Sequence, residues 1–287
     1  MIFDTHTDVL FDIINNNHSF SYHLHEMSGY YGAVLNYYFK GNESYDSFLF
    51  VLDKIKKFYN SNLKLLKKHN FILGLEGLGP LRSLSDIKLL KNAGIRIVTL
   101  TWNDSNKIAT GTYQNKKRDL TQFGRLLLNE LKKENIILDL SHLNVKSFYD
   151  VMSFYDGRMI VSHSNVRRLK NNERNLTDNQ LRILKSKNIL VGVNTYHKFV
   201  GKDINDYIKI INYLKRMIGL DKICLGLDFD YYLSNVSSSG SIKGLQKADD
   251  LNNLYNSLLK EKYSLEEIEN IFYKNAINFF KSTLIMW

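Results

Sequence analysis

Short apolar segments alternate regularly with amphipathic segments from residue 71 onward, and this alternation constrains the fold more than any other feature. The apolar segments are rich in β-branched residues and predict strands, whereas the segments between them have a helical period. The predicted strands comprise residues 2–4, 32–39, 71–76, 96–101, 136–140, 159–162, 189–194 and 222–227. The predicted helices comprise residues 83–92, 120–134, 145–153, 177–187, 203–217, 246–260 and 265–282.

Strands that alternate with helices pair in parallel, and continuous apolar strands are typical of a sheet that is covered by helices. Eight such strands predict an α/β fold, namely a (β/α)8 TIM-like barrel with C-terminal closing helices. No linker or repeat divides the sequence, so we expect a single domain over residues 1–287.

Capping residues support several of the predicted helices. Ser83, Thr121 and Thr177 stand before helical segments, where a hydroxyl can accept a hydrogen bond from the first turn. Ser264 is followed three residues later by Glu267, the spacing of a capping box. These positions predict where the helices begin.

The net charge of +10 raises the question of a nucleic-acid or membrane partner. The basic residues are spread along the chain, and the densest groups, Lys116 to Arg118 and Arg167 to Lys170, are short and lack interleaved aromatic residues. A solvated basic surface is therefore the preferred interpretation, with neither nucleic acid nor membrane as a partner.

The single cysteine, Cys224, lies inside an apolar segment, so we expect a buried thiol and no intrachain disulfide. The N-terminal residues do not resemble a secretory signal, and no segment approaches the length of a membrane span. These features predict a cytoplasmic protein.

Two polar, aromatic and aperiodic stretches, residues 15–31 and 231–246, each follow a predicted strand. Loops at the carboxyl ends of barrel strands form the mouth of the active site, so we expect these stretches to contact the substrate. Ordinary surface loops are the alternative.

Acidic and histidine residues stand where the predicted strands end. Because the carboxyl ends of parallel strands meet at one rim of a barrel, these side chains should converge. Imidazoles and carboxylates are ligands that divalent metals prefer, although each residue alone could equally be a hydrogen-bonded structural residue. The six residues are His6, Asp8, Glu76, His142, His163 and Asp228.

The order and spacing of several motifs resemble those of a known family, the membrane or renal dipeptidases (peptidase family M19) of the amidohydrolase-like barrels. The resemblance covers nearly the whole chain. Its motifs are DTHTD, GLEG, VTLTWNDSN, LTQFGRLLLNELKKENIILDLSHL, VSHSNVRRLKNNERNLTD, GLDFD and NAINFF.

This resemblance implies a zinc-dependent dipeptidase with two Zn²⁺ ions. His6 and Asp8 would hold one ion, His142 and His163 the other, and Glu76 would bridge them. The catalytic residues would be Glu76 and Asp228, since Asp228 would accept a proton from the bridging water and pass it to the leaving amine.

The resemblance also implies that Arg174 binds the free carboxylate of a dipeptide, which a planar guanidinium suits. The alternative is an exposed arginine at a helix N-terminus. Trp102 departs from the best-known branch of the family, which has a histidine there. Oxyanion stabilisation would then fall to a zinc ion, to the Trp102 indole, or to Asn103 and Asn106.

Two other functions remain open at this point. The same barrel and metals could act on a lactone, a cyclic amide or a modified peptide, since one fold hosts many chemistries. A catalytically silent protein that binds an acidic partner is the other. The sequence also does not determine which dipeptides are preferred, which metal is bound, or whether the protein forms a homodimer.

Overall fold

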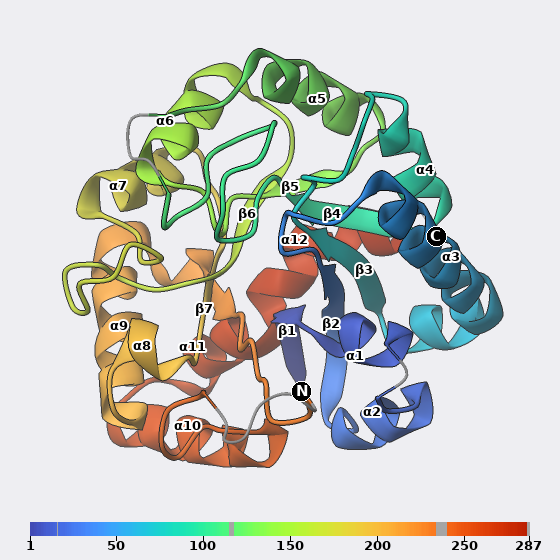
Figure 1. Ribbon diagram of the computed structural model, residues 1–287. Coiled ribbons are helices and arrows are strands. Elements are labelled where there is room, and N and C mark those ends of the chain that lie inside the picture. Colours follow the sequence, from blue (N-terminus) through green and yellow to red (C-terminus); the bar gives the residue numbers. More distant parts are fainter. Residues whose placement is uncertain (16, 115–117, 234–239, 286–287) are drawn as a thin grey trace. The chain divides into compact units, whose positions relative to one another are not determined.

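The structure is a computed structural model and describes residues 1–15, 17–114, 118–233 and 240–285. Its eight strands form a closed parallel barrel in sequence order, which confirms the predicted (β/α)8 fold (Figure 1). The strands are β1 (Ile2–Thr7), β2 (Tyr30–Tyr38), β3 (Phe71–Glu76), β4 (Ile95–Thr99), β5 (Ile137–Asp139), β6 (Met159–Ser164), β7 (Val191–Val193) and β8 (Ile223–Leu225).

Contacts divide the chain into two compact units. The first unit comprises Met1–Val34 and Val161–Trp287, and the second comprises Leu35–Ile160. The boundary passes through strands β2 and β6. The expectation of a single domain over residues 1–287 stays a prediction.

In the first unit, β1 pairs with β8 at Asp4 and Leu225, and β7 pairs with β8 along its whole length. The buried ring of Phe3 stacks on Phe280 at 5.3 Å, so the last helix packs against the first strand. The α-helices of the first unit are α1 (Val9–Ile14), α2 (Phe20–Glu26), α7 (Asp178–Ser186), α8 (His197–Val200), α9 (Ile204–Ile218), α10 (Leu251–Lys260), α11 (Leu265–Glu269) and α12 (Asn275–Ile285). Its shorter helical segments are the 3-10 turns Leu220–Lys222 and Ala248–Asp250 and the π-helical turn Asn270–Lys274, which interrupts the predicted helix 265–282.

In the second unit, β3, β4 and β5 pair in parallel, with Thr99 opposite Asp139 at the carboxyl end of β4. The helices lie outside these strands (Figure 1). They are α3 (Tyr45–Lys68), α4 (Asp86–Asn92), α5 (Gln122–Lys133) and α6 (Val145–Phe154).

The structure corrects three local predictions. The stretch 15–31 contains a helix, α2, because Ser19 caps it by accepting a hydrogen bond from the Tyr22 amide at 3.2 Å. The longest helix, α3, was not predicted. Ser83 is not a cap, because α4 begins at Asp86, whose carboxylate instead accepts the Ser83 amide at 2.9 Å.

The other predicted caps are confirmed. Thr121 caps α5, Thr177 caps α7 in a capping box, and Ser264 with Glu267 forms the predicted capping box of α11. Cys224 is a buried thiol, as expected. Of the stretches named above, Asn16, Lys116, Lys117 and residues 234–239 lie outside the described residues.

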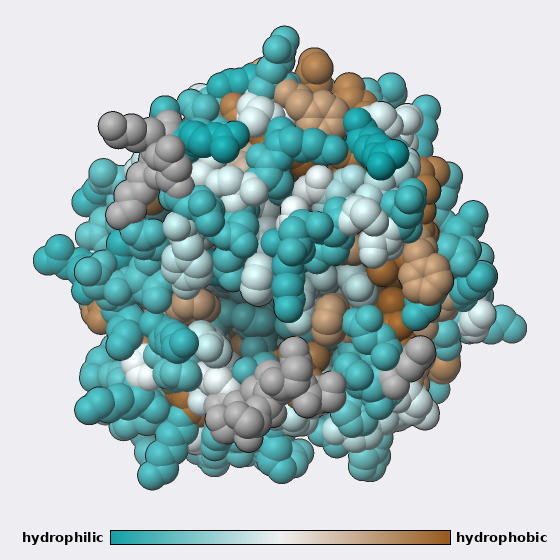
Figure 2. All heavy atoms as spheres, viewed as in Figure 1, coloured by the Kyte–Doolittle hydropathy of each residue, from teal (hydrophilic) through white to brown (hydrophobic). Residues whose placement is uncertain are grey.

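Hydrophilic side chains predominate on the face shown in Figure 2. Within the described ranges, no helix combines the length and the apolar composition that crossing a bilayer requires.

Candidate metal centre

The carboxyl end of β1 brings one imidazole between two carboxylates in the first unit. His6 Nε2 lies 3.6 Å from Asp8 Oδ1 and 3.7 Å from Asp228 Oδ1. His6 is buried, and the three residues offer ligand atoms within 4.8 Å of one another. His6 and Asp8 are two residues apart at the end of an extended strand, where alternate side chains point to the same side, and this explains their closeness.

His163 lies beside His6 in the same unit, with ring centroids 3.8 Å apart. The Ser162 hydroxyl is 2.7 Å from His163 Nδ1. A partner at Nδ1 fixes the orientation of an imidazole and directs Nε2 toward a metal, as is usual for histidine ligands.

Glu76 and His142 pair in the second unit. Glu76 is the last residue of β3, and its Oε1 lies 3.3 Å from His142 Nε2. Both side chains are buried. Asn103 Oδ1 lies 3.0 Å from His142 Nδ1, so Asn103 holds this ring as Ser162 holds that of His163.

Asp139 is a buried carboxylate that was not among the residues predicted from the sequence. It ends β5, and it offers an oxygen within 4.8 Å of one from Glu76. It also accepts the Ser141 amide at 3.0 Å. An aspartate inside the apolar segment IILDL was the signal that could have identified it.

Asp4 was also missed, although it is fully buried one residue from Thr5 and two from His6. Its Oδ1 accepts the amides of His6 at 3.1 Å and Leu227 at 2.9 Å, which ties the ends of β1 and β8 together. Burial raises the pKa of Asp4 to about 7, against the lowering effect of these amides and of His6.

Two of the candidate residues have a left-handed backbone, with φ of 68° at His142 and 56° at Asp228. Non-glycine residues rarely adopt this conformation, and it is concentrated at functional sites. Asp228 is held by the Asn194 amide, whose Nδ2 donates to Asp228 Oδ2 at 2.7 Å.

Arg174 is buried, with 5% of its surface exposed, which excludes the exposed-arginine alternative. Its guanidinium carbon lies 5.5 Å from the centroid of the Phe199 ring. Its carbonyl accepts the Ser164 hydroxyl at 2.8 Å, which fastens the loop that carries it to the end of β6.

Trp102 lies between two rings of the second unit. It stacks with Tyr38 at 5.8 Å and with His142 at 6.3 Å. Asn106 supports the loop after β4, because its Nδ2 donates to the Leu100 carbonyl and its Oδ1 accepts the Ile108 amide.

The donor sets fit divalent metal ions. Each unit contributes imidazole nitrogens beside carboxylate oxygens, a combination that suits zinc and other first-row metals. The residues that would hold metal are His6, Asp8 and His163 in the first unit, and Glu76 and His142 in the second.

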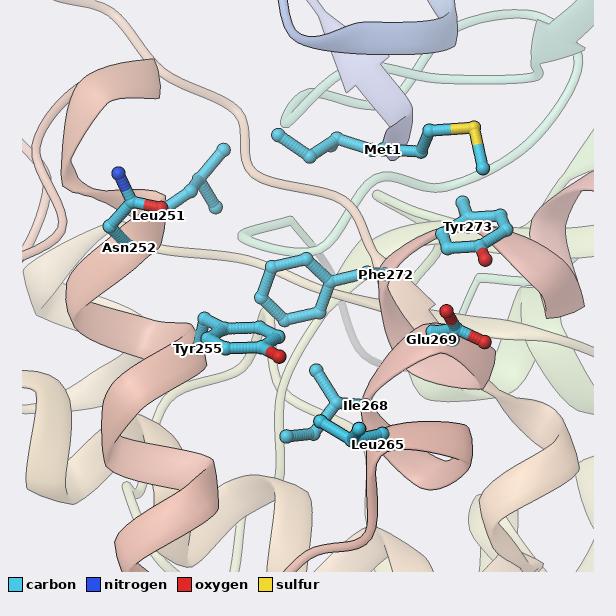
Figure 3. A pocket seen from close by; sticks show the side chains of 10 residues that line it. Met1, Leu251, Asn252, Tyr255, Leu265, Ile268, Glu269, Phe272 and Tyr273 are labelled. Carbon is cyan, nitrogen blue, oxygen red and sulfur yellow. The ribbon is translucent and has the colours of Figure 1, made fainter.

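A cavity of about 370 Å³ lies elsewhere in the first unit (Figure 3). It adjoins Met1 and Ile2 at the amino end of β1, and apolar and aromatic side chains such as Leu251 and Phe272 line much of it. None of the candidate ligands lines this cavity, and the amino-terminal face of such barrels serves stability rather than catalysis.

The barrel and the histidines and carboxylates at its strand ends define the class of metal-dependent hydrolases. The model of the membrane dipeptidase family (peptidase family M19) matches residues 50–284, and the chain belongs to this family of metallo-dipeptidases.

The relatives are distant. An uncharacterised protein of Klebsiella pneumoniae from the pqqA 5′ region is 26% identical over 69% of this chain and 75% of its own. An uncharacterised dipeptidase of Schizosaccharomyces pombe is 28% identical over 74% of this chain, which spans about half (52%) of that protein.

Among solved structures, a metallopeptidase of Rhodobacter sphaeroides liganded with a phosphinate mimic of the dipeptide L-Ala-D-Ala superposes with a TM-score of 0.81. It is 19% identical, and the match covers 98% of both chains. This likeness shows the same fold.

Proposed function

We propose that this protein is a binuclear zinc dipeptidase that hydrolyses dipeptides with a free C-terminal carboxylate. The observation that carries the proposal is the pairing of imidazoles with carboxylates at strand ends, His6 with Asp8 and Asp228, and His142 with Glu76. Membership of the dipeptidase family supports the reaction type.

In this proposal His6 and Asp8 would hold one zinc ion, His142 and His163 would hold the other, and Glu76 would contribute its carboxylate to both. The barrel order supports the assignment, because parallel strands present their carboxyl ends at one rim. Ser162 and Asn103 would orient the rings of His163 and His142 through Nδ1.

The chemistry that zinc supplies when bound is a water whose pKa falls from 15.7 to about 7, a strong nucleophile at neutral pH. Asp228 takes a proton from the attacking water and delivers it to the leaving amine as the C–N bond breaks and the C–O bond forms. The Asn194 amide donates to Asp228 Oδ2 at 2.7 Å, and Asp228 Oδ1 lies 3.7 Å from His6 Nε2, so the carboxylate is oriented with Oδ1 on the side of this proposed ligand.

Arg174 supplies the dipeptide specificity in this proposal. A buried guanidinium pairs strongly with a carboxylate, and a fixed anchor of this kind limits the length of peptide that reaches the reacting carbonyl. Trp102, which stacks on His142, would offer the substrate an apolar surface and an indole N–H. Asn103, which is hydrogen-bonded to His142, would also contact the substrate.

A relative of the same fold was crystallised with a phosphinate mimic of a dipeptide, which supports dipeptides as the substrate class. A cytoplasmic location, and the lack of nucleic-acid and membrane partners, stay predictions of the sequence.

The test is elemental analysis and a dipeptide panel on one protein preparation. We expect bound zinc and hydrolysis of dipeptides, with little hydrolysis of the same dipeptides as C-terminal amides, because a neutral amide cannot form the bidentate ion pair that a carboxylate forms with Arg174. Arg174→Lys should raise KM for dipeptides more than it lowers kcat. A zinc-replete preparation that leaves the whole panel intact contradicts the proposed function.

If dipeptides and their amides are cleaved equally well, carboxylate recognition by Arg174 is wrong and a different amide or ester substrate follows. A lactone, a cyclic amide or a modified peptide would then be the substrates to examine, since none of them requires that contact.

A further inference from the structure

A second cluster of metal-ligating side chains lies in the N-terminal helices of the first unit. Asp12 belongs to α1, His23 belongs to α2, and His18 stands between the two helices. His18 Nδ1 is 2.9 Å and His23 Nε2 is 2.7 Å from the same oxygen, Asp12 Oδ2. Ligand atoms of all three lie within 4.8 Å of one another.

The burial of this cluster is unusual for charged groups. The side chains of Asp12 and His23 are 0% and 1% exposed, whereas His18 is 36% exposed. Asp12 Oδ1 is buried and has no hydrogen-bond partner among the described residues. A buried carboxylate oxygen without a donor is costly, and a bound cation removes that cost.

We propose that Asp12, His18 and His23 form a further binding site for a divalent transition-metal cation of the zinc type, with an open coordination position on the exposed His18 side. Two imidazoles and one carboxylate are a donor set that zinc accepts. In a tetrahedral site with bonds of 2.0–2.1 Å, the ligand atoms lie roughly 3.3 Å apart, so the observed spacings need only a small expansion.

Two features of the surroundings agree with this site. Burial lowers the pKa of His23, against the raising effect of Asp12, which favours the neutral imidazole that binds metal. The ring of Tyr22 stacks on His18 at 4.3 Å and restricts that side chain although it is partly exposed.

The cation would fasten α2 to α1 next to the first strand end. Asp8 precedes α1 and its carbonyl accepts the Asp12 amide at 3.1 Å. Tyr232 packs edge-on against His23 at 5.1 Å, and its hydroxyl accepts the Asp8 amide at 3.0 Å. A cation bound by Asp12 and His23 would therefore restrain both backbone hydrogen bonds of Asp8, the one from the Asp12 amide to its carbonyl and the one from its amide to Tyr232.

The experiment counts zinc per chain by elemental analysis after dialysis against a defined concentration of free Zn²⁺. The variants are His18→Ala and Asp12→Asn, with His25→Ala as the matched control. His25 is an exposed histidine of α2, the helix that carries His23, and it belongs to none of the candidate metal clusters. Circular dichroism checks the folding of each variant, and Tm is measured with and without Zn²⁺.

We expect His18→Ala and Asp12→Asn to bind one zinc fewer per chain than the wild type and His25→Ala, and to gain less in Tm when Zn²⁺ is added. Equal zinc content in the wild type and His18→Ala overturns the proposal and leaves a hydrogen-bonded His–Asp–His cluster. If Asp12→Asn does not fold, the zinc content of His18→Ala still tests the proposal, because His18 is partly exposed.

The result is separable from the proposed function. His163→Ala should reduce the zinc content whether or not the further site exists, because His163 is a proposed ligand of the dipeptidase centre. Loss of one ion in His18→Ala supports the further site even if no dipeptide is hydrolysed.

Discussion

Gly192 in β7 is a position where the packing of the barrel strands can be tested directly. A Cβ atom at this residue would lie 1.8 Å from the carbonyl oxygen of Ser162 and 2.5 Å from Thr5 Oγ1. A Cβ atom closer than 3.0 Å to another heavy atom forces one of the two to move, and the distance to the Ser162 oxygen is more than 1 Å shorter than that. The Ser162 carbonyl cannot move freely, because the Thr5 hydroxyl donates to it at 2.6 Å.

We expect Gly192→Ala to lower the free energy of unfolding by about 3 kcal/mol or more, the upper range for overpacking in a core. In a chain of this size, that corresponds to a fall in Tm of roughly 6–12 °C. Calorimetry and urea denaturation with an unchanged m value measure the effect.

Gly29→Ala is the matched control, since nothing lies within 4 Å of its added Cβ and its φ is not left-handed. It should change stability by no more than about 0.5 kcal/mol. A Gly192→Ala variant as stable as this control would refute the reasoning. Gly192→Ala should also retain less zinc, because it displaces Ser162, whose hydroxyl orients the ring of His163.

Three further predictions concern the site and the closing helices. Asn103→Ala should weaken zinc binding about 10- to 100-fold and leave the fold intact, because it removes the hydrogen-bond partner of the proposed ligand His142. Competition with a chelating dye measures the zinc affinity. Asp228→Asn should reduce kcat at least about 100-fold with little change in zinc content, which separates proton transfer from metal binding. Lys215 Nζ lies 2.6 Å from Glu267 Oε1, and this contact holds the pKa of Glu267 below its usual value. The pair therefore stabilises the native state at a pH above the pKa of Glu267 in the unfolded chain. This stabilisation is lost as the pH falls through the lower pKa of the folded state. Glu267→Gln should therefore be about 0.5 kcal/mol less stable than the wild type at pH 7, and the difference should disappear in acid when denaturation is compared across pH.

Each of these three predictions can fail independently. Unchanged zinc affinity in Asn103→Ala would assign that side chain to the substrate alone. An active Asp228→Asn would remove Asp228 from proton transfer, and a stability gap for Glu267→Gln that persists in acid would show that the carboxylate charge is not what matters.

The barrel could be predicted because apolar segments recur regularly along the chain, and several of them end at a histidine or a carboxylate. His142 and Glu76 were identified in this way, and the structure places them 3.3 Å apart. Asp139 was missed because it lies inside such a segment and was counted as part of the strand. Its burial depends on neighbouring strands that the sequence does not display.

Contacts made by loops were also beyond prediction. The pairing of Asn103 with His142 depends on the path of the loop after β4, which local sequence does not determine. Helix α3 did carry a signal, since Phe48, Leu52 and Ile55 recur at helical spacing and are buried, but it precedes the regular alternation.

The left-handed backbone at His142 and Asp228 determines which substitutions can be interpreted there. Asparagine and glycine tolerate this conformation, whereas alanine or glutamate pays about 1–2 kcal/mol for it. Asp228→Asn therefore changes only the chemistry of the side chain, while Asp228→Ala or Asp228→Glu also pulls the chain toward another path. A loss of activity in those variants would mix two causes, and a comparison with Asp228→Gly would tell them apart.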